Sequence, residues 1–382
     1  MILPFARLGR DMPRPNRAKR GWLVGVGIVV AACSASADPP AAVSPPSSIG
    51  PSSTAASVPV TTSITTSLPT TSTGLTETTP SVTPLKVTGL EEYPVTGNRP
   101  HDVAVAPDGL VWYTAQGSGR LDRLDPETGD VTEVALGSGA APHGVVIDDD
   151  GNAWVTEQGL NALVLVDHDS LAVDVYPAPA DVAMHTAAFA PNGMLWFTGQ
   201  RDYVGRFDPA TGQMDLFETE GGPYGITITP AGDVYYAALA GSHIARVDPA
   251  SGAITRIEPP TADQGARRVW TDSAGRIWVS YWNTGHLAVY DPANGSWSEW
   301  KLPGEAPQAY AVYVDETDHP WVSDFGGDDA ILRFDPATET FESFGLPSPG
   351  GEVRQILGRP GEVWGAESAA NALIAVRYRP EE

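Results

Sequence analysis

An aromatic residue that recurs at a nearly constant interval is the feature that most constrains the fold of this chain. It follows a Gly or Asp by three residues, and its successive spacings are 42, 42, 39, 43, 43 and 43. The seven positions are Trp112, Trp154, Trp196, Tyr235, Trp278, Trp321 and Trp364. A period of about 40–50 residues with several short apolar strands per unit is typical of β-propellers. The repeat therefore predicts an all-β, seven-bladed propeller.

Each repeat unit contains the segments of a four-stranded blade. An apolar strand such as "GVVID" precedes a turn such as "DDG", and the strand that carries the aromatic residue follows. A third strand such as "LAVYDP" ends in a turn of the type "DPATG" or "DPANG", and a fourth strand comes next. Asp-Pro opening and Gly closing suit the tight turns of such hairpins. We therefore expect four strands per blade, with the aromatic residue of each repeat at the same place in the core of its blade.

The two ends of the repeat region complement each other. The last unit stops after its third strand, "NALIAVRYR", and the region begins with an unpartnered strand of the fourth type, "KVTGLEEYPV", at 86–95. Pairing of these segments would close the ring and leave only short, protected strand edges. We predict that strand 86–95 completes the last blade, that the propeller domain spans 85–382, and that it is a monomer.

The segments before the propeller have a different composition. Residues 1–33 begin with a basic stretch and continue into a short apolar run that ends at Cys33, the only cysteine. This pattern resembles a bacterial lipoprotein signal with a lipobox, and an ordinary signal peptide is the alternative. Residues 34–84 are rich in Ser, Thr, Pro and Ala, which predicts a disordered linker. We expect an exported cell-envelope lipoprotein that contacts the membrane only through its N-terminal lipid.

The net charge of the chain excludes some partners. At −24, the chain repels nucleic acid and anionic lipid surfaces, so neither is expected as a partner. A small-molecule or cyclic peptide-like ligand at the channel mouth is expected instead.

Eleven residues before each blade aromatic lies the start of the innermost strand, which lines the channel of a propeller. We call this the ring position; its occupants are His101, His143, His185, Tyr224, Arg267, Tyr310 and Val353. Strand pairing does not require His at a position that also accepts Tyr, Arg and Val. Imidazole suits proton abstraction, metal ligation and hydrogen bonding, so the three His residues are candidate catalytic groups. Tyr224, Arg267 and Tyr310 are candidate substrate-binding groups, and the alternative is that all are half-buried polar residues wetted by channel water.

Carboxylates are expected near the ring, at the ends of second strands. Glu157, Asp324 and Glu367 each stand three residues after a blade aromatic. A hairpin about Asp150 should make Glu157 a near cross-strand neighbour of His143, where it could orient the imidazole or ligate a metal. Arg268, beside Arg267, is expected to belong to a basic loop.

The stretches "APHGVVIDDDGNAWVTEQG", "GGPYGITITPAGDVYYA" and "YVGRFDPATG" resemble the virginiamycin B lyase family. The resemblance implies a seven-bladed propeller over residues 86–380 and the opening of a streptogramin B lactone by elimination at a His–Mg²⁺ site. It also implies Mg²⁺ as cofactor and two alternative registers for the site. His101 with His143 brings Glu157 into the metal-binding role, whereas His143 with His185 puts Gly199 there. In either register an alanine, Ala141 or Ala183, stands where the family pattern has the Glu of Glu-Pro-His.

Three functions are compatible with these residues. The first is a C–O lyase that opens a lactone or ester by elimination at the His-rich mouth. The alternative is a non-catalytic extracytoplasmic propeller that binds a ligand or protein on the same face. A lactone hydrolase of the gluconolactonase type is a third reading, but it needs a Ca²⁺ site of Glu, Asn and Asp at the ring position, which has none.

Overall fold

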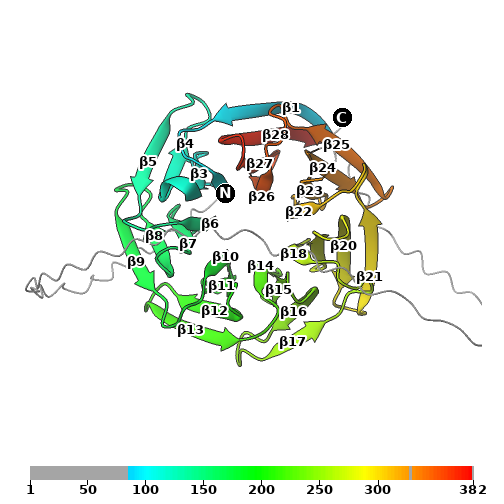
Figure 1. Ribbon diagram of the computed structural model, residues 1–382, viewed down its shortest axis with the longest axis horizontal. Helices are drawn as coiled ribbons and strands as arrows, with labels where there is room; N and C mark the ends of the chain where they lie inside the picture. Colours follow the sequence, from blue (N-terminus) through cyan, green and yellow to red (C-terminus); the bar gives the residue numbers. More distant parts are fainter. Residues whose placement is uncertain (1–84, 327–328, 381–382) are drawn as a thin grey trace, which may run out of the picture. The chain divides into compact units, whose positions relative to one another are not determined.

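The computed structural model describes residues 85–326 and 329–380, and they form seven four-stranded antiparallel sheets set as blades around a central axis (Figure 1). The predicted signal segment 1–33 with Cys33, and the predicted linker 34–84, lie outside the described residues. Within the described part, the one helix is the 3₁₀ turn η1 (Gln116–Ser118), and no helix is long and apolar enough to cross a membrane. The predicted fold class is confirmed.

The strands fall into four concentric sets. The innermost are β2 (Pro100–Val105), β6 (Pro142–Ile147), β10 (Met184–Phe189), β14 (Pro223–Ile228), β18 (Ala266–Thr271), β22 (Ala309–Val314) and β26 (Val353–Arg359). The second are β3 (Val111–Ala115), β7 (Ala153–Glu157), β11 (Leu195–Gly199), β15 (Val234–Ala238), β19 (Ile277–Tyr281), β23 (Pro320–Asp324) and β27 (Glu362–Glu367). The third are β4 (Arg120–Leu124), β8 (Ala162–Val166), β12 (Tyr203–Asp208), β16 (His243–Val247), β20 (His286–Asp291), β24 (Ala330–Asp335) and β28 (Ala372–Pro380). The outermost are β5 (Val131–Ala135), β9 (Val173–Pro177), β13 (Gln213–Glu218), β17 (Ile254–Ile257), β21 (Ser296–Lys301), β25 (Thr340–Gly345) and β1 (Leu85–Pro94).

The first strand of the propeller closes the ring. Blades 1 to 6 are consecutive in sequence, from β2–β5 to β22–β25, and blade 7 combines β26–β28 with β1. β1 pairs antiparallel with β28 from Leu85 to Pro94, with Tyr93 opposite Leu373 (Figure 1). The predicted closing strand, 86–95, is thus confirmed within one residue at each end.

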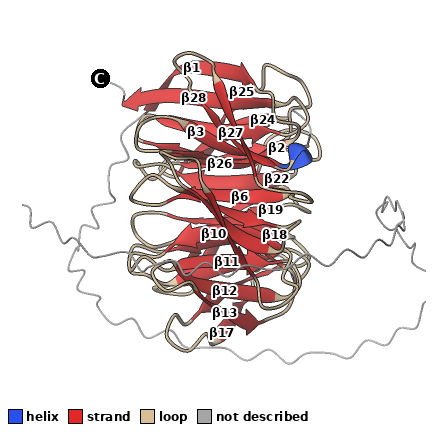
Figure 2. Cartoon of the chain, turned by 90° about the vertical axis from the view of Figure 1, so that its left-hand side faces the viewer, coloured by secondary structure: helices blue, strands red, loops and turns tan. Residues whose placement is uncertain are grey.

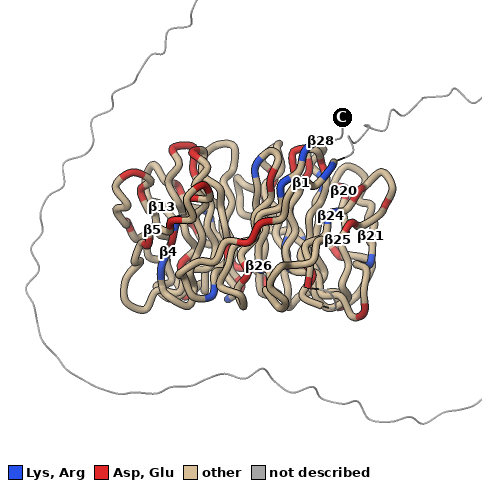
Figure 3. The backbone as a smooth tube through the Cα atoms, turned by 90° about the horizontal axis from the view of Figure 1, so that it is seen from above, with Lys and Arg blue, Asp and Glu red and all other residues tan. Residues whose placement is uncertain are grey.

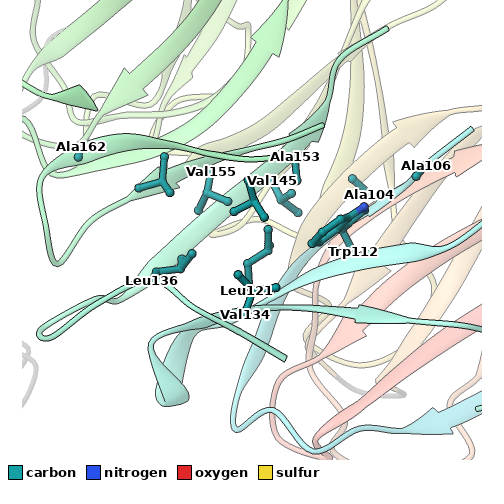
Figure 4. Close-up of a cluster of buried hydrophobic side chains, with 12 residues drawn as sticks. Ala104, Ala106, Trp112, Leu121, Val134, Leu136, Val145, Ala153, Val155 and Ala162 are labelled. Carbon is teal, nitrogen blue, oxygen red and sulfur yellow. The ribbon is translucent and has the colours of Figure 1, made fainter. Parts of the chain in front are cut away.

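The blades pack on each other through apolar faces. All seven blade aromatics are buried. Figure 4 shows one interblade cluster, in which Trp112 and Leu121 of blade 1 pack with Val145 and Val155 of blade 2. Similar clusters follow around the ring, and the strands run across its thickness as Figure 2 shows. The interpretation of the blade aromatics as core is confirmed, because burial of such faces is what stabilises the ring.

A β-bulge opens each innermost strand. In all seven blades the register between the first and second strands shifts directly after the first paired residue, as between Pro100 and Val103 in blade 1. A bulge interrupts strict alternation and re-aims side chains. The ring residue and the residue after it therefore both reach the channel.

A hydroxyl on the second strand ties each of five blades to the next one. Thr156 Oγ1 accepts the Gly144 N–H of its own blade at 2.8 Å and donates to the His185 carbonyl of the following blade at 2.5 Å. The same arrangement is made by Thr114, Thr198, Ser280 and Ser323. Each of these bonds fixes the carbonyl group of the ring residue in one blade to the second strand of the blade before it.

Candidate functional site

One end of the channel is a cavity that gathers the predicted site residues. It has a volume of about 500 Å³ and contains six of the seven ring residues. We call it the mouth cavity; it is lined by Arg99, His101, Gln116, Gly117, Ala141, His143, Gln158, His185, Gln200, Tyr224, Arg267, Tyr310 and Arg354. Of the predicted site residues within the described part, only Glu157 is absent from this lining.

The three His residues form a continuous column of mutually tilted rings across blades 1 to 3, which we call the stack. Ring centroids are 3.8 Å apart for His101 and His143 and 3.7 Å apart for His143 and His185. Tyr224 of blade 4 continues the stack, 3.7 Å from His185. The His side chains are 3 %, 5 % and 1 % exposed, so they are packed walls of the channel rather than freely solvated groups.

The hydrogen-bond partners set the tautomer of each imidazole. His101 Nδ1 lies 2.8 Å from Asp102 Oδ1, and His143 Nδ1 lies 3.1 Å from the His185 carbonyl oxygen. His185 Nδ1 lies 3.1 Å from the Tyr224 carbonyl oxygen. A carbonyl or carboxylate oxygen only accepts, so Nδ1 carries the proton in each ring. Nε2 is then the lone-pair nitrogen, and no described residue bonds to any of the three Nε2 atoms.

The surroundings keep these imidazoles neutral. Burial lowers the pKa of all three well below the usual value, because a buried cation loses its hydration. Neighbouring His rings further lower the pKa values of His143 and His185, and the Arg268 guanidinium lowers the pKa values of all three. At neutral pH the stack is therefore an array of uncharged hydrogen-bond acceptors.

Beneath the stack an ion pair crosses the channel. Arg268 Nη2 of blade 5 lies 3.0 Å from Asp102 Oδ1 of blade 1, and Arg268 Nη1 donates to Thr186 Oγ1 of blade 3 at 2.8 Å. All three residues directly follow a ring residue, so the bulges bring them inward. The expectation that Arg268 belongs to a basic loop is wrong: it lies on β18, its side chain is buried, and both of its Nη atoms bond across the channel. The pair divides the mouth cavity from a second, largely apolar cavity of about 390 Å³.

The opposite wall of the mouth is aromatic and cationic. The Arg267 guanidinium lies 3.6 Å from the Tyr310 ring centroid and 4.4 Å from that of Trp282. Its Nη2 donates to the Tyr224 hydroxyl at 2.8 Å. Phe325 stacks on the other side of Tyr310 with centroids 4.4 Å apart. Cation–π contacts of this kind hold a guanidinium without neutralising it.

The two tyrosine hydroxyls in this wall form a coupled pair. Tyr224 Oη and Tyr310 Oη are 2.6 Å apart. Burial would raise both pKa values, but for Tyr310 the Arg267 and Arg268 guanidiniums and the hydrogen bond from Tyr224 outweigh burial and lower the pKa. Burial and the neighbouring Tyr310 raise the pKa of Tyr224. Because of this difference in pKa, Tyr224 keeps its proton and donates the hydrogen bond to the Tyr310 oxygen.

Three glutamines complete the polar wall, and the sequence-based reasoning missed them. Gln116, Gln158 and Gln200 line the mouth above His101, His143 and His185, and the Gln158 and Gln200 amides bond at 3.3 Å. Each stands four residues after its blade aromatic, and only the position three residues after was considered. The same position in blades 5 and 6 holds Trp282 and Phe325, so counting one residue further could have found both walls.

Glu157 is turned away from the mouth. Its cross-strand partner is Pro142 rather than His143, because the bulge falls at His143. Its two carboxylate oxygens accept the backbone N–H groups of Ala141 and Leu160. Burial raises its pKa in spite of these bonds. Asp324 accepts two backbone N–H groups in the same way, so these carboxylates hold loops in place.

The donor set fits Mg²⁺ poorly. Mg²⁺ prefers oxygen ligands in octahedral geometry, and the lining of the mouth cavity contains no carboxylate. Among the described residues, one trio offers donor atoms within 4.8 Å of one another, namely His101, Asp102 and His143. Asp102 in that trio is already committed to His101 and Arg268. The Mg²⁺ expectation stays a prediction, and no chemical step is derived through the ion.

The mouth is therefore two-sided. One side offers three neutral imidazole acceptors and three amides, and the other offers an unneutralised guanidinium among aromatic rings. Such convergent polar groups in a concave site are typical of small-molecule sites. Proton abstraction from carbon would need a stronger base, or an electrophile that stabilises the carbanion. The described lining of the mouth cavity has no carboxylate that could hold a metal ion beside the imidazoles.

Comparisons with known proteins agree on the fold and the family. The model of the virginiamycin B lyase family matches residues 88–376. Selenomethionine-substituted virginiamycin B lyase from Staphylococcus aureus is similar in structure, with a TM-score of 0.70, 21% identity, and coverage of 77% of this chain and 99% of that chain. A catalytically inactive variant of that enzyme with quinupristin gives the same TM-score, identity and coverage.

A propeller with a different partner is also similar. The structure of YCF48 bound to a D1 peptide has a TM-score of 0.63 and 15% identity, and the match covers 79% of this chain and 100% of that chain. At these identities the structural likenesses show the fold alone, and no curated protein matches the sequence. Because the family model spans most of the propeller, from within β1 into β28, the chain belongs to the virginiamycin B lyase family.

Proposed function

We propose that this chain is a small-molecule-binding propeller whose ligand sits in the mouth cavity. The observation that carries the proposal is the set of polar atoms that the protein itself leaves without partners. The Nε2 atoms of the three ring His residues face no hydrogen-bond donor among the described residues, and His185 Nε2 is also buried. An unsatisfied buried polar atom costs about 1–3 kcal/mol, and a bound ligand or ordered water would recover this cost.

The lack of a free carboxylate beside His143 favours binding without turnover over an elimination reaction. Ala141 leaves no carboxylate two residues before His143, and Glu157 uses both oxygens for backbone amides. The low pKa of the buried imidazoles also makes them weak bases. These features suit a site that recognises a ligand through hydrogen bonds.

Ester elimination is the second candidate, because the stack places three neutral imidazoles at the mouth. A neutral imidazole with its proton fixed on Nδ1 presents a free lone pair, as a general base must. In this candidate, Nε2 of His143 removes a proton from the carbon next to the one that bears the ester oxygen, a C=C bond forms, and the C–O bond breaks so that the acyl part leaves as a carboxylate. Arg267 would then stabilise the developing negative charge.

Quinupristin separates the two candidates. The purified chain is titrated with quinupristin in a calorimeter, and the mixture is analysed by chromatography with mass spectrometry for a ring-opened isomer of unchanged mass. Binding that weakens in His143→Ala, without an isomer, supports the binding function. Formation of the isomer by the wild type and not by His143→Ala would replace the binding proposal by the lyase.

We also propose that the propeller acts outside the cytoplasm, attached through a lipid on Cys33. The lipobox-like end of the signal segment supports this location, and the acidic net charge of the chain fits attachment by lipid rather than by surface charge. Metabolic labelling with a radioactive fatty acid should mark the wild-type chain and not Cys33→Ser. Equal labelling of the two would contradict lipidation.

A further inference from the structure

Two arginines of the mouth have no acidic partner, although acidic residues outnumber basic ones two to one in the chain. The chain has 47 Asp and Glu against 23 Lys and Arg, and Figure 3 shows acidic positions on strands and loops of the ring in an edge-on view. Within the described part, no carboxylate forms an ion pair with Arg99 or Arg267, whereas Arg354 pairs with Glu352 at 2.5 Å. Arg267 Nε is in addition buried without a hydrogen-bond partner.

The position of Arg267 shows that its charge is available to a ligand. Aromatic rings flank its guanidinium, and its single hydrogen bond in the described part goes to the neutral Tyr224 hydroxyl. A guanidinium group stays charged in proteins. Inside a concave site the field of an unpaired cation is screened less than at an open surface. The mouth therefore favours an anion on this side.

The rim beside Arg267 offers flat apolar surface. Trp282 and Phe325 are half-buried, stand edge to face 5.6 Å apart, and both contact Tyr310. Aromatic side chains in such an arrangement accept another ring by stacking or edge contact. The opposite wall accepts hydrogen bonds, because each of the three imidazoles presents an unprotonated Nε2.

We propose that the ligand of the mouth is an organic anion that carries a flat ring and an N–H group, as an N-acylated aromatic amino acid or the carboxyl end of a peptide does. This inference rests on the proposed binding function and names its ligand class. The carboxylate pairs with Arg267 and Arg99, the ring packs against Trp282 and Phe325, and the N–H donates to a His Nε2. The carboxylate and the N–H of the ligand each meet a group that the described protein leaves without an acidic partner or a hydrogen-bond donor, and the ring adds contact with the aromatic rim.

Calorimetry with four related probes tests the inference on the full chain. N-acetyl-phenylalanine carries all three features, its amide lacks the charge, 3-phenylpropanoate lacks the N–H, and N-acetyl-alanine lacks the ring. We expect the amide to bind about tenfold more weakly than the acid, the usual order for losing one charge-assisted hydrogen bond. We expect the other two probes to bind several-fold more weakly than N-acetyl-phenylalanine.

Arginine variants locate the anion contact. Arg267→Gln should reduce the preference for acid over amide to less than about twofold, and Arg267→Lys should keep part of it, since only the fork of donors is lost. Arg256→Gln is the matched control, because Arg256 lies on outer strand β17 and pairs with Glu220 and Glu258; its preference should equal that of the wild type. Denaturation midpoints check that each variant folds. Added salt should weaken binding of the acid more than binding of the amide in the wild type and in Arg256→Gln, and less so in Arg267→Gln.

The outcomes separate the inference from the function on which it rests. Equal affinity of the wild type for acid and amide overturns the anionic ligand class and leaves the binding function standing. An unchanged preference in folded Arg267→Gln overturns the assignment to Arg267. If no probe binds at millimolar concentration and none moves the imidazole resonances of the ring His residues, the inference is wrong. The proposed function falls as well only if quinupristin also fails to bind.

Discussion

At the scale of single residues, the carboxylate that ends the second strand has different hydrogen-bond partners in different blades. The carboxylates that end the second strands of blades 2 and 6, Glu157 and Asp324, each accept the N–H of the residue two before the ring position. In blade 7 that N–H belongs to Gly351 and is donated to Asp329 instead. Glu367, the third carboxylate, is therefore buried with both oxygens unpartnered among the described residues.

The surroundings of Glu367 make it a titrating group near neutrality. Burial, with smaller contributions from the nearby carboxylates Glu92 and Asp329, raises the pKa of Glu367 to about 8. The folded protein then holds a proton that the unfolded chain releases near pH 4.5. Stability from this group is present at low pH and is lost as pH rises to about 8, by about 1.4 kcal/mol per pH unit.

Glu367→Gln should remove this loss of stability. The neutral amide keeps the shape and cannot ionise, so the variant should gain stability relative to the wild type between about pH 6 and pH 9. Urea unfolding at both pH values measures the difference. Glu157→Gln is the control in the same register and should lose stability at both pH values, since it removes a charged acceptor from two backbone amides. A Glu367→Gln effect that does not change with pH would contradict the account.

Asp102→Asn should destabilise the propeller strongly. The substitution leaves the buried Arg268 guanidinium without its carboxylate, and breaking such a pair costs about 3–5 kcal/mol. Denaturant unfolding of the single variants and of Asp102→Asn with Arg268→Gln gives the coupling between the two residues. A cost below about 1 kcal/mol for the single variant would show that the channel pair is solvated.

The sequence predicts the ring position well and the residue after it poorly. The regular period made His101, His143 and His185 identifiable as channel residues, and they do line the mouth. Asp102 and Arg268 were not predicted as channel residues, because strict strand alternation would send the side chain after the ring residue to the opposite face. Seven bulges break that alternation, and nothing in a single residue type announces them.

At the scale of the strands, the second strand of a blade is the element that orients the next blade's ring residue. A Thr or Ser stands two residues after the blade aromatic in blades 1, 2, 3, 5 and 6, and Ala237 and Ala366 stand there in blades 4 and 7. The hydroxyl satisfies two buried backbone groups at once, one in each of two blades. This pattern is readable in the sequence, but its partners are known only once the blades are placed side by side.

Thr156→Val should therefore loosen the site through the backbone. The change leaves the buried Gly144 N–H without its acceptor, which costs about 1–3 kcal/mol. It also removes one of the two donors to the His185 carbonyl, which keeps its bond to His143 Nδ1. Thr132→Val on the exposed face of β5 is the control and should change stability by less than about 0.5 kcal/mol. Urea midpoints and the His185 imidazole resonances provide the measurements. Equal effects of the two substitutions would show that the interblade hydroxyl has no structural role.

At the scale of the whole molecule, ring closure decides stability. β1 forms the outer strand of blade 7 and packs Tyr93 against Trp364, with ring centroids 5.2 Å apart. Sequence reasoning could predict this closure because the missing fourth strand of the last repeat and the extra strand at the start were both visible. Contacts across the channel could not be predicted, since they depend on the angle between non-adjacent blades.

A chain that begins at residue 95 should lose cooperative folding. It exposes the hydrogen-bonding edge of β28 and the apolar face of Trp364, and such an edge promotes aggregation. A chain that begins at residue 85 retains β1 and should unfold at the same temperature as the full chain. Circular dichroism melts and size-exclusion chromatography compare the two. A soluble, cooperatively melting chain from residue 95 would contradict the role assigned to β1.

The proposed binding site depends on the three imidazoles being neutral acceptors that are free to bind a ligand. Nitrogen NMR of the ring His residues, recorded over pH and with added N-acetyl-phenylalanine, tests this most directly. We predict that at pH 7 each Nδ1 is protonated and each Nε2 is not, that the imidazoles protonate only well below pH 6.5, and that the His143 Nε2 resonance moves when the probe is added. Titration of the three rings near pH 6.5, with no response to the probe, would contradict the account.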